Sequence, residues 1–199
     1  MNWFYSFSKT LPRWACRLWF RVSVEGTENV PPDGGLVFAG NHASYLDPLM
    51  MGVFVRRRCR FIARSSLRKV PLVGAWMKGV GVIFIDRKSP GRAAVGRAIE
   101  CLDSGQVLGF FPEGTRSPDG RLQEFQKGLL LLLKKSDANV VPVGIEGTFS
   151  AFPKGAFIPR PRRVTVRYGT ARPASEVLAP GGLEALRQEV AVLSRSEMA

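Results

Sequence analysis

The chain contains a single histidine, His42, and an aspartate, Asp47, follows it five residues later. Histidine is the side chain that can accept and release a proton near neutral pH without help from its surroundings. A carboxylate within reach of its ring can orient the imidazole and stabilise the imidazolium that forms when it takes a proton. The segment 41–48 therefore predicts a general base, His42, with Asp47 as its partner. The alternative is an incidental surface histidine beside an aspartate that only caps a helix.

The residue after the aspartate explains how two side chains five positions apart can meet. Residues at this spacing lie on different faces of a continuous helix. Pro48 disfavours helical backbone at Asp47 and is itself suited to the first turn of a helix. We therefore expect residues 41–46 to form a loop and Asp47 to be the N-cap of a helix, so that His42 folds back onto it. The backbone N–H groups of this loop are candidate donors to an oxyanion.

A second group of polar side chains lies at 111–117, in the sequence Phe-Pro-Glu-Gly-Thr-Arg-Ser. Arg116 has the planar fork of donors that suits a phosphate, and Glu113 can accept a hydrogen bond from a ligand hydroxyl. A charged, glycine-containing loop at the end of a strand can present backbone N–H groups, a hydroxyl and a guanidinium to one ligand. The alternative is an ordinary turn in which Glu113 and Arg116 form a surface ion pair.

Two other segments give weaker signals. Arg87 follows the apolar stretch 80–85, and a basic side chain there would complete a phosphate pocket with Arg116. Pro142 lies inside the apolar stretch 140–145. A proline inside a strand indicates an edge position or a bulge, where a ligand often approaches.

Short apolar stretches alternate with stretches of helical periodicity over most of the chain. The predicted strands are 21–24, 36–40, 60–63, 80–85, 107–111, 140–145 and 164–168, and the predicted helices are 48–55, 73–78, 91–102, 124–136 and 182–195. This alternation predicts an α/β fold, a single domain with a mostly parallel or mixed central sheet flanked by helices. Both polar loops follow predicted strands, and ligands bind at the carboxyl ends of strands in such sheets. The leucine run at 128–133 predicts a fully buried helix, or alternatively the wall of an acyl-chain tunnel.

Residues 1–21 differ in composition from the rest of the chain. Three of the four tryptophans occur here among arginines, without an acidic residue. The pattern predicts an amphipathic helix or helix pair lying in lipid headgroups, followed by one globular domain over 22–199. The alternative is a helix docked on its own domain. Since no stretch approaches the roughly 18 apolar residues of a spanning helix and no signal-peptide pattern is present, we expect peripheral attachment.

Composition restricts the class of partner. Lys and Arg number 29 against 16 acidic residues, so the formal net charge is +13. Such a surface favours nucleic acid, an anionic membrane or phosphorylated small molecules. The basic clusters at 56–58 and 160–163 lack a nucleic-acid-reading motif, so we expect a membrane surface and no nucleic acid. Three scattered cysteines and one histidine argue against a metal site and indicate reduced thiols in the cytosol.

The order of the motifs resembles the glycerolipid acyltransferase family, in particular its bacterial 1-acylglycerol-3-phosphate acyltransferases. The matching blocks are Asn-His-x4-Asp-Pro, Ile-Asp-Arg, Phe-Pro-Glu-Gly-Thr-Arg-Ser and Val-Pro-Val-Gly, between about residues 26 and 146. The resemblance implies that His42 is the general base oriented by Asp47. It also implies that Arg87, Glu113 and Arg116 hold the glycerol phosphate, with Gly114 and Thr115 shaping the loop that contains two of them.

The same resemblance suggests three further substrate-binding positions. Pro142 would lie near the acyl donor. Many family members carry lysine where this chain has Arg64, and Lys-Lys-Gly where it has Gln126, Lys127 and Gly128. Arg64 keeps the positive charge of the family pattern, whereas Gln126 does not.

The resemblance implies transfer of a fatty acyl group to the sn-2 hydroxyl of 1-acylglycerol-3-phosphate (lysophosphatidic acid), giving phosphatidic acid on the cytoplasmic face of the cell membrane. Acyl-CoA or acyl carrier protein would be the co-substrate, with no cofactor. We expect direct transfer; the alternative, a covalent acyl-enzyme on Ser44, lacks the Gly-x-Ser-x-Gly elbow. Other acceptors, namely glycerol-3-phosphate, a lysophospholipid or another hydroxylated lipid, would use the same base. A non-catalytic lipid-binding protein is the alternative from another class.

Overall fold

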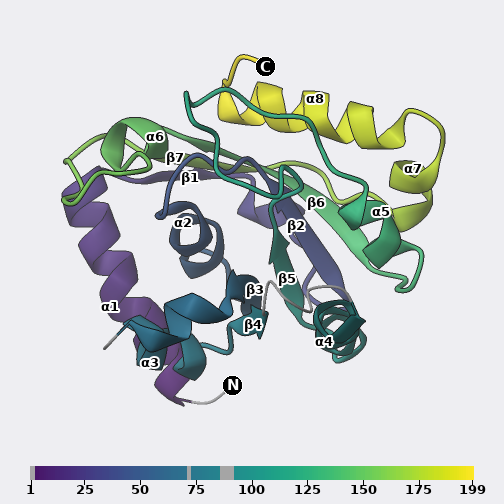
Figure 1. Cartoon of the computed structure of the whole chain (residues 1–199), viewed down its shortest axis with the longest axis horizontal. Helices are drawn as coiled ribbons and strands as arrows, with labels where there is room; N and C mark the ends of the chain where they lie inside the picture. Colours follow the sequence, from purple (N-terminus) through teal and green to yellow (C-terminus); the bar gives the residue numbers. More distant parts are fainter. Residues whose placement is uncertain (1–2, 71–72, 86–91) are drawn as a thin grey trace.

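The computed structural model describes residues 3–70, 73–85 and 92–199, and within them it forms a seven-stranded sheet with helices on both faces (Figure 1). The spatial strand order is β1-β7-β6-β2-β5-β3-β4. Neighbouring strands are parallel except β6 and β7, which are antiparallel. The strands are β1 (Ser23–Glu25), β2 (Leu36–Gly40), β3 (Cys59–Arg64), β4 (Ile83–Ile85), β5 (Val107–Phe110), β6 (Asn139–Glu146) and β7 (Thr165–Tyr168). The predicted α/β fold with a mixed sheet is confirmed.

Eight α-helices are found within the same described ranges. They are α1 (Trp3–Phe20), α2 (Asp47–Val53), α3 (Val73–Gly79), α4 (Arg92–Asp103), α5 (Gly128–Leu133), α6 (Thr148–Ala151), α7 (Ala174–Leu178) and α8 (Gly182–Ser194). The short helices α6 and α7 were not predicted, because a single helical turn is too short to show periodicity.

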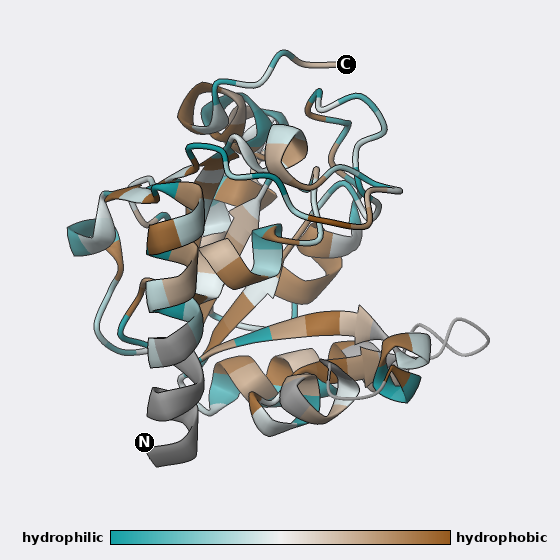
Figure 2. Cartoon of the chain, turned by 90° about the vertical axis from the view of Figure 1, so that its left-hand side faces the viewer, coloured by the Kyte–Doolittle hydropathy of each residue, from teal (hydrophilic) through white to brown (hydrophobic). Residues whose placement is uncertain are grey.

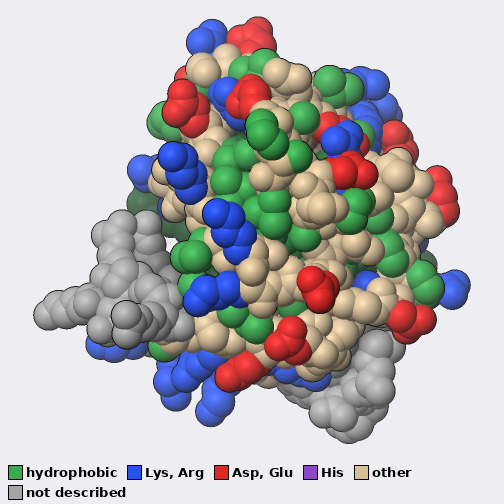
Figure 3. All heavy atoms as spheres, turned by 90° about the vertical axis from the view of Figure 1, so that its right-hand side faces the viewer, with side chains coloured by type: hydrophobic (Ala, Val, Ile, Leu, Met, Phe, Trp, Pro, Cys, Tyr) green, Lys and Arg blue, Asp and Glu red, His purple; other side chains and the backbone are tan. Residues whose placement is uncertain are grey.

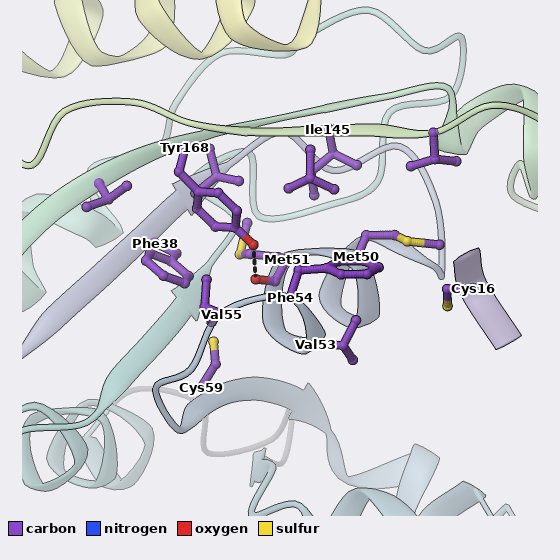
Figure 4. Close-up of a cluster of buried hydrophobic side chains, with 14 of the residues drawn as sticks. Cys16, Phe38, Met50, Met51, Val53, Phe54, Val55, Cys59, Ile145 and Tyr168 are labelled. Carbon is purple, nitrogen blue, oxygen red and sulfur yellow. Dashed lines mark hydrogen bonds between the residues drawn. The ribbon is translucent and has the colours of Figure 1, made fainter. Parts of the chain in front are cut away.

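Two hydrophobic clusters fill the two faces of the sheet. On β2, Leu36 and Phe38 belong to the cluster under α1 and α2, whereas Val37 and Ala39 belong to the cluster under α4, α5 and α8. This alternation follows from the period of two in a strand, and it explains why β2 reads as a continuous apolar run. In the first cluster the buried Tyr168 hydroxyl donates a 2.8 Å hydrogen bond to the carbonyl oxygen of Met51, which ties β7 to α2 (Figure 4).

Pro142 lies in an interior strand, because β6 is flanked by β2 and β7. It pairs with Ala39 on one side, and on the other its carbonyl accepts a hydrogen bond from Gly169. Between the pairs Val143–Tyr168 and Val140–Arg172, the β7 side has one residue more than β6. Such an extra residue defines a bulge, which removes the need for the N–H that proline lacks. The predicted bulge is therefore confirmed, and the edge position is wrong.

The leucine helix α5 is shorter than predicted and is not buried on every side. Leu129, Leu132 and Leu133 are buried, whereas Leu131 is half-exposed. Its six residues make less than two turns, so one position of the run necessarily faces outward.

The N-terminal segment forms one continuous helix, α1, and not a helix pair. Cys16 and Phe20 are buried in the core, so one face of α1 docks on the domain. Trp14, Leu18 and Trp19 of the same helix are exposed. Within the described residues, none of the helices combines the length and apolarity needed to cross a bilayer.

Candidate active site

The loops after β2 and β5 meet at the carboxyl-terminal edge of the sheet, because these two strands are parallel neighbours. The backbone N–H of His42 donates to Glu113 Oε1 at 2.6 Å. In return, the backbone N–H of Ser117 donates to the carbonyl oxygen of His42 at 2.7 Å. The two polar motifs recognised in the sequence are therefore one connected site. Asn41 adds a link to β6, since its side-chain amide exchanges two 2.8 Å hydrogen bonds with the backbone of Ile145.

His42 and Asp47 are in direct contact. His42 Nδ1 lies 2.9 Å from Asp47 Oδ2, the aspartate is fully buried, and the imidazole keeps 19% of its side-chain surface exposed. An ionised carboxylate only accepts hydrogen bonds, so it favours the tautomer with the proton on Nδ1. The other ring nitrogen, Nε2, is then unprotonated, and it has no partner among the described residues. The pair has the geometry of a general base with an orienting carboxylate.

Asp47 organises the loop as well as the imidazole. Its Oδ2 also accepts hydrogen bonds from the backbone N–H groups of Ala43 and Ser44, both at 2.7 Å. Asp47 is the first residue of α2, and Leu46 is its N-cap, so the predicted capping role of Asp47 is wrong. The carboxylate satisfies donors of the loop before the helix instead of donors within the helix.

The loop backbone has little capacity left for an oxyanion. The N–H groups of residues 42–44 already donate to the carboxylates of Glu113 and Asp47. The N–H of Leu46 donates to Ser44 Oγ, and the N–H of Asp47 donates to the carbonyl oxygen of Ser44. A donor that already has a buried acceptor cannot also stabilise a developing negative charge without losing that bond. The expectation that these groups form an oxyanion hole is therefore wrong for each of the residues just named.

Two aromatic rings support the imidazole. The His42 ring stacks on Phe111 with a centroid separation of 4.1 Å, and Phe111 in turn stacks on Phe61 at 6.3 Å. Phe61 lies over Gly109 of β5, where any side chain would overlap its ring. Aromatic contacts of this kind restrict the orientation of the imidazole, as the Asp47 hydrogen bond does.

Glu113 connects the two loops through both of its carboxylate oxygens. Oε1 accepts from His42, and Oε2 accepts from the backbone N–H of Gln123 at 2.9 Å. The side chain is buried, and burial raises the pKa of Glu113 to about 7, although the two backbone hydrogen bonds oppose this shift. Among the described residues no ion pair joins Glu113 and Arg116. Glu113 is thus placed to position His42, while its predicted contact with a substrate hydroxyl stays a prediction.

The raised pKa makes stability depend on pH. An unfolded glutamate releases its proton near the ordinary value of 4.5, whereas folded Glu113 holds it to about 7. The folded state binds more protons between these values, so the free energy of unfolding should fall as pH rises, by on the order of 3 kcal/mol at most. Glu113→Gln should remove this slope and also lower stability at acid pH, because its amide NH2 faces a backbone N–H.

Urea unfolding of both proteins across this pH range measures the effect. Glu124→Gln is the matched control, since Glu124 is exposed on the same segment. It should keep the slope of the parent protein. An unchanged slope in Glu113→Gln would assign the pH dependence to another group.

Arg116 stacks on an aromatic ring of the His42 loop, that of Tyr45. Its guanidinium carbon is 3.5 Å from the centroid of the Tyr45 ring, a stacking distance. The Nη1 atom is buried and has no hydrogen-bond partner among the described residues. Tyr45 is half-exposed and its ring also contacts Phe152 at 5.9 Å. The arrangement leaves Arg116 with unused donors, held in place by a ring that the sequence analysis did not single out.

Ser44 is not placed to act as a nucleophile. Its side chain is fully buried, and its hydroxyl donates to the carbonyl oxygen of Phe152 at 2.7 Å while accepting from the N–H of Leu46. These bonds give Ser44 a structural role between the His42 loop and the segment after α6. The arrangement favours direct transfer over a serine acyl-enzyme.

The other predicted site residues lie in different settings. Gly114 and Thr115 are exposed, and Gly114 has a φ of +69°, a conformation that favours glycine. Lys127 is exposed at the start of α5, adjacent to Gln126, whose N–H donates to the Pro112 carbonyl. Arg64 ends β3, and Arg87 lies outside the described residues. Pro142 is buried in the sheet.

One cavity adjoins the His42 loop and another lies between α5, α7 and α8, and His42 lines neither of them. One of about 290 Å³ lies behind the His42 loop, against Asn41 and Ala43 on one side and Thr148 on the other. A second of about 460 Å³ is lined by apolar residues that include Phe125, Leu130 and Leu183 and by the charged Glu124, Glu184 and Arg187. Hydrophobic side chains gather on the face that carries α5 and α7 (Figure 3). The larger cavity is connected to Glu113 through Gln123. Arg187, which lines the cavity, donates to the carbonyl oxygen of Gln123 at 3.1 Å, and the N–H of Gln123 donates to Glu113.

Two site residues that were not predicted, Tyr45 and Asn41, could have been recognised in the sequence. Tyr45 lies within the motif that contains the base, and an aromatic residue close to a predicted phosphate-binding arginine is a recognisable signal. Asn41 precedes the base directly, as a polar residue at the end of an apolar strand. Phe152 gives no such signal, because its contact with Ser44 joins residues 108 positions apart.

Comparison with known proteins agrees with the site. A family model described as Acyltransferase matches residues 21–146. A chloroplastic 1-acyl-sn-glycerol-3-phosphate acyltransferase from Arabidopsis thaliana is 36% identical over 69% of this chain and 39% of its own length. A 1-acyl-sn-glycerol-3-phosphate acyltransferase from Borreliella burgdorferi is 34% identical over 67% of this chain and 54% of its own length. The match thus spans about half the length of these relatives or less.

The fold agrees over a longer range. The crystal structure of the 1-acyl-sn-glycerophosphate acyltransferase PlsC from Thermotoga maritima superimposes with a TM-score of 0.77 and 33% sequence identity. It covers 96% of this chain and 76% of that one. Both motif loops of the candidate site fall within the region that the family model matches, and the chain belongs to the acyltransferase family.

Proposed function

We propose that the protein transfers a fatty acyl group from a thioester to the sn-2 hydroxyl of 1-acylglycerol-3-phosphate, giving phosphatidic acid. The observation that carries the proposal is the 2.9 Å contact between His42 Nδ1 and the buried Asp47, which leaves Nε2 to act as a base in the loop whose Tyr45 ring carries Arg116. The similar proteins from Arabidopsis thaliana and Borreliella burgdorferi are 1-acyl-sn-glycerol-3-phosphate acyltransferases, which supports the choice of acceptor. The thioester donor is acyl-CoA or an acyl chain carried by acyl carrier protein, and transfer from either requires no further cofactor.

The reaction follows from the positions of these groups. Nε2 of His42 takes the proton of the acceptor hydroxyl as its oxygen attacks the thioester carbonyl carbon. Asp47 stabilises the imidazolium while the tetrahedral intermediate exists. When the carbon–sulfur bond breaks, the imidazolium returns the proton to the departing sulfur. The products are the ester and a free thiol, and His42 is neutral again.

The experiment is a mixture of purified protein, lysophosphatidic acid and a long-chain acyl-CoA, in which thiol release and phosphatidic acid are both measured. Equal formation of the two products supports the proposal. Transfer only to glycerol-3-phosphate or a lysophospholipid would keep the reaction and change the acceptor. Absence of transfer with acyl-CoA and acyl carrier protein donors across these acceptors would contradict the enzyme proposal and favour a lipid-binding protein.

Arg116 is proposed to bind the acceptor phosphate, and Tyr45 to hold Arg116 for it. Loss of the ring in Tyr45→Ala should raise KM for lysophosphatidic acid by about tenfold with a smaller change in kcat, because a partly buried cation–π contact contributes about 1–2 kcal/mol. Tyr45→Phe keeps the ring and should retain the KM of the parent. Steady-state kinetics of the two variants measure the difference. Equal KM values for both variants would remove Tyr45 from phosphate binding.

The protein is proposed to attach to the cytoplasmic face of the cell membrane as a peripheral protein. Trp14, Leu18 and Trp19 of α1 are 61%, 79% and 52% exposed. Arg13 and Arg17 lie over the edge of the domain at the Phe54 ring but stay exposed, the exposed Arg21 follows the helix, and no acidic residue occurs in the first 24 positions. Apolar and aromatic side chains flanked by arginines suit the headgroup region of an anionic leaflet.

A further inference from the structure

A second apolar projection lies beside α1. Residues 153–163, the Phe157 loop, connect α6 to β7, and at its tip Phe157 and Ile158 are 96% and 76% exposed. Two adjacent, almost fully exposed large hydrophobic side chains are unfavourable in water. We propose that the Phe157 loop is a second membrane-contact element, which inserts into the same anionic bilayer surface as α1. This inference rests on the proposed membrane attachment of α1.

The loop is held in a defined shape. Gly155 has a φ of +90°, and the N–H of Ala156 donates to the Pro153 carbonyl at 3.1 Å, closing a turn just before the tip. After the tip, the N–H of Arg160 donates to the Ala151 carbonyl at 2.8 Å. These bonds keep Phe157 and Ile158 at the apex, where they do not pack on the domain. An apex fixed in this way loses little conformational entropy when it enters a membrane.

The Phe157 loop and α1 are directly connected. Trp19 Nε1 donates to the Pro159 carbonyl at 3.3 Å, and the N–H of Val164 donates to the Phe20 carbonyl at 3.1 Å. The end of α1 and the loop therefore lie on the same side of the molecule (Figures 1 and 2). The exposed indole of Trp19 lies between the exposed residues of α1 and those of the loop. Because the two elements are in contact at Trp19, we expect one bilayer surface to reach both.

Charge identifies the surface that fits. Lys154, Arg160, Arg162 and Arg163 are exposed around the apex, and no acidic residue occurs between Glu146 and Glu176. An anionic leaflet offers phosphates to the basic side chains and an acyl region to Phe157 and Ile158. Nucleic acid would satisfy the arginines and provide a base to stack on Phe157, but it leaves the aliphatic Ile158 without a favourable environment. The combination favours a lipid surface.

The base of the Phe157 loop touches the candidate active site. The carbonyl oxygen of Phe152 accepts the Ser44 hydroxyl, and the Phe152 ring contacts Tyr45. Tyr45 in turn carries Arg116. A bilayer in contact with the loop would therefore lie close to His42 and Arg116, so that a lipid acceptor can reach the base while its acyl chain stays in the leaflet.

The test compares Ile158→Asp with Val192→Asp. Val192 on α8 is exposed to the same fraction, 76%, so the two variants introduce the same charge at equally exposed positions. Co-sedimentation with vesicles of phosphatidylglycerol and phosphatidylcholine in equal parts measures binding without any substrate. We expect Ile158→Asp to weaken partitioning by about tenfold and Val192→Asp to leave it unchanged. Thermal unfolding confirms that both variants are folded.

Other outcomes decide against the inference. If Ile158→Asp and Phe157→Asp both bind as the parent protein does, the loop does not enter the membrane. Equal binding of the parent to pure phosphatidylcholine vesicles would overturn the role of charge, and tight binding to a DNA oligonucleotide unaffected by Ile158→Asp would favour a nucleic-acid surface for the arginines.

Acyl-transfer assays separate this inference from the proposed function. With a short-chain acceptor dissolved in water, Ile158→Asp should match the parent protein. With lysophosphatidic acid embedded in vesicles, it should be about tenfold slower, in line with its weaker binding. Absence of transfer in both formats would remove the proposed activity, while the vesicle-binding result would still decide whether the loop contacts lipid.

Discussion

Replacing His42 with alanine is expected to lower kcat by about a hundredfold to ten-thousandfold, because general-base catalysis contributes this range. The chain offers no substitute, since His42 is its only histidine. The loss should appear in both thiol release and lipid product, measured in the assay with lysophosphatidic acid and acyl-CoA. KM should change little, because the arginine proposed to bind the phosphate is untouched.

Free imidazole provides the control for this prediction. His42→Ala leaves a space over the Phe111 ring that the imidazole occupied at 4.1 Å. Added imidazole should enter it and restore part of the rate in proportion to its concentration. Activity that survives the substitution without imidazole would contradict the role of His42 as the base. Thermal unfolding shows whether the variant is folded.

Asp47→Asn is expected to lower kcat by about a thousandfold or more while leaving the fold intact. The asparagine oxygen can take the place of Oδ2 and accept the same hydrogen bonds from His42, Ala43 and Ser44. Its neutral amide cannot stabilise the imidazolium, which is the charged state that follows proton transfer. A comparable substitution in the serine-protease triad has an effect of about ten-thousandfold. Imidazole should not rescue this variant, because the His42 side chain is still present.

Asp47→Ala separates catalysis from loop structure. It leaves the N–H groups of Ala43 and Ser44 without an acceptor in a buried loop, at about 1–3 kcal/mol for each unsatisfied group. Urea unfolding should therefore show a clear loss of stability in the alanine variant and a small one in the asparagine variant. Equal stability of the two would show that Asp47 does not hold the loop.

The fold was predictable from the sequence because its strands are buried on both faces. Residues 36–40 read as an uninterrupted apolar run, and the structure places alternate members of it in two different clusters. Helix α4, which begins at Arg92, was recognisable from the spacing of its apolar residues alone. The interior place of β6 in the sheet was not predictable. Proline removes one strand hydrogen bond, and its presence alone does not distinguish an edge strand from an interior strand with a bulge.

The candidate site was predictable in its residue types but not in its bonding. The pairing of His42 with Asp47 follows from the proline after the aspartate. The double role of Oδ2 does not, since it depends on the path of the loop in three dimensions. Similarly, Glu113 was recognised as functional, but its bond to the His42 backbone joins residues 71 positions apart, which only the neighbouring arrangement of β2 and β5 brings together.

The absence of a side chain at Gly109 has a consequence for how this enzyme family can vary. The Phe61 ring occupies the space over Gly109, Phe111 stacks on Phe61, and the imidazole of His42 stacks on Phe111. One added methyl group in the middle of a strand would thus be transmitted through two rings to the reacting nitrogen. A substitution at Gly109 would therefore act on the orientation of the base through two intervening rings. Substitutions at Gly109 and Phe61 therefore offer a way to change the orientation of the His42 ring without altering His42 or Asp47.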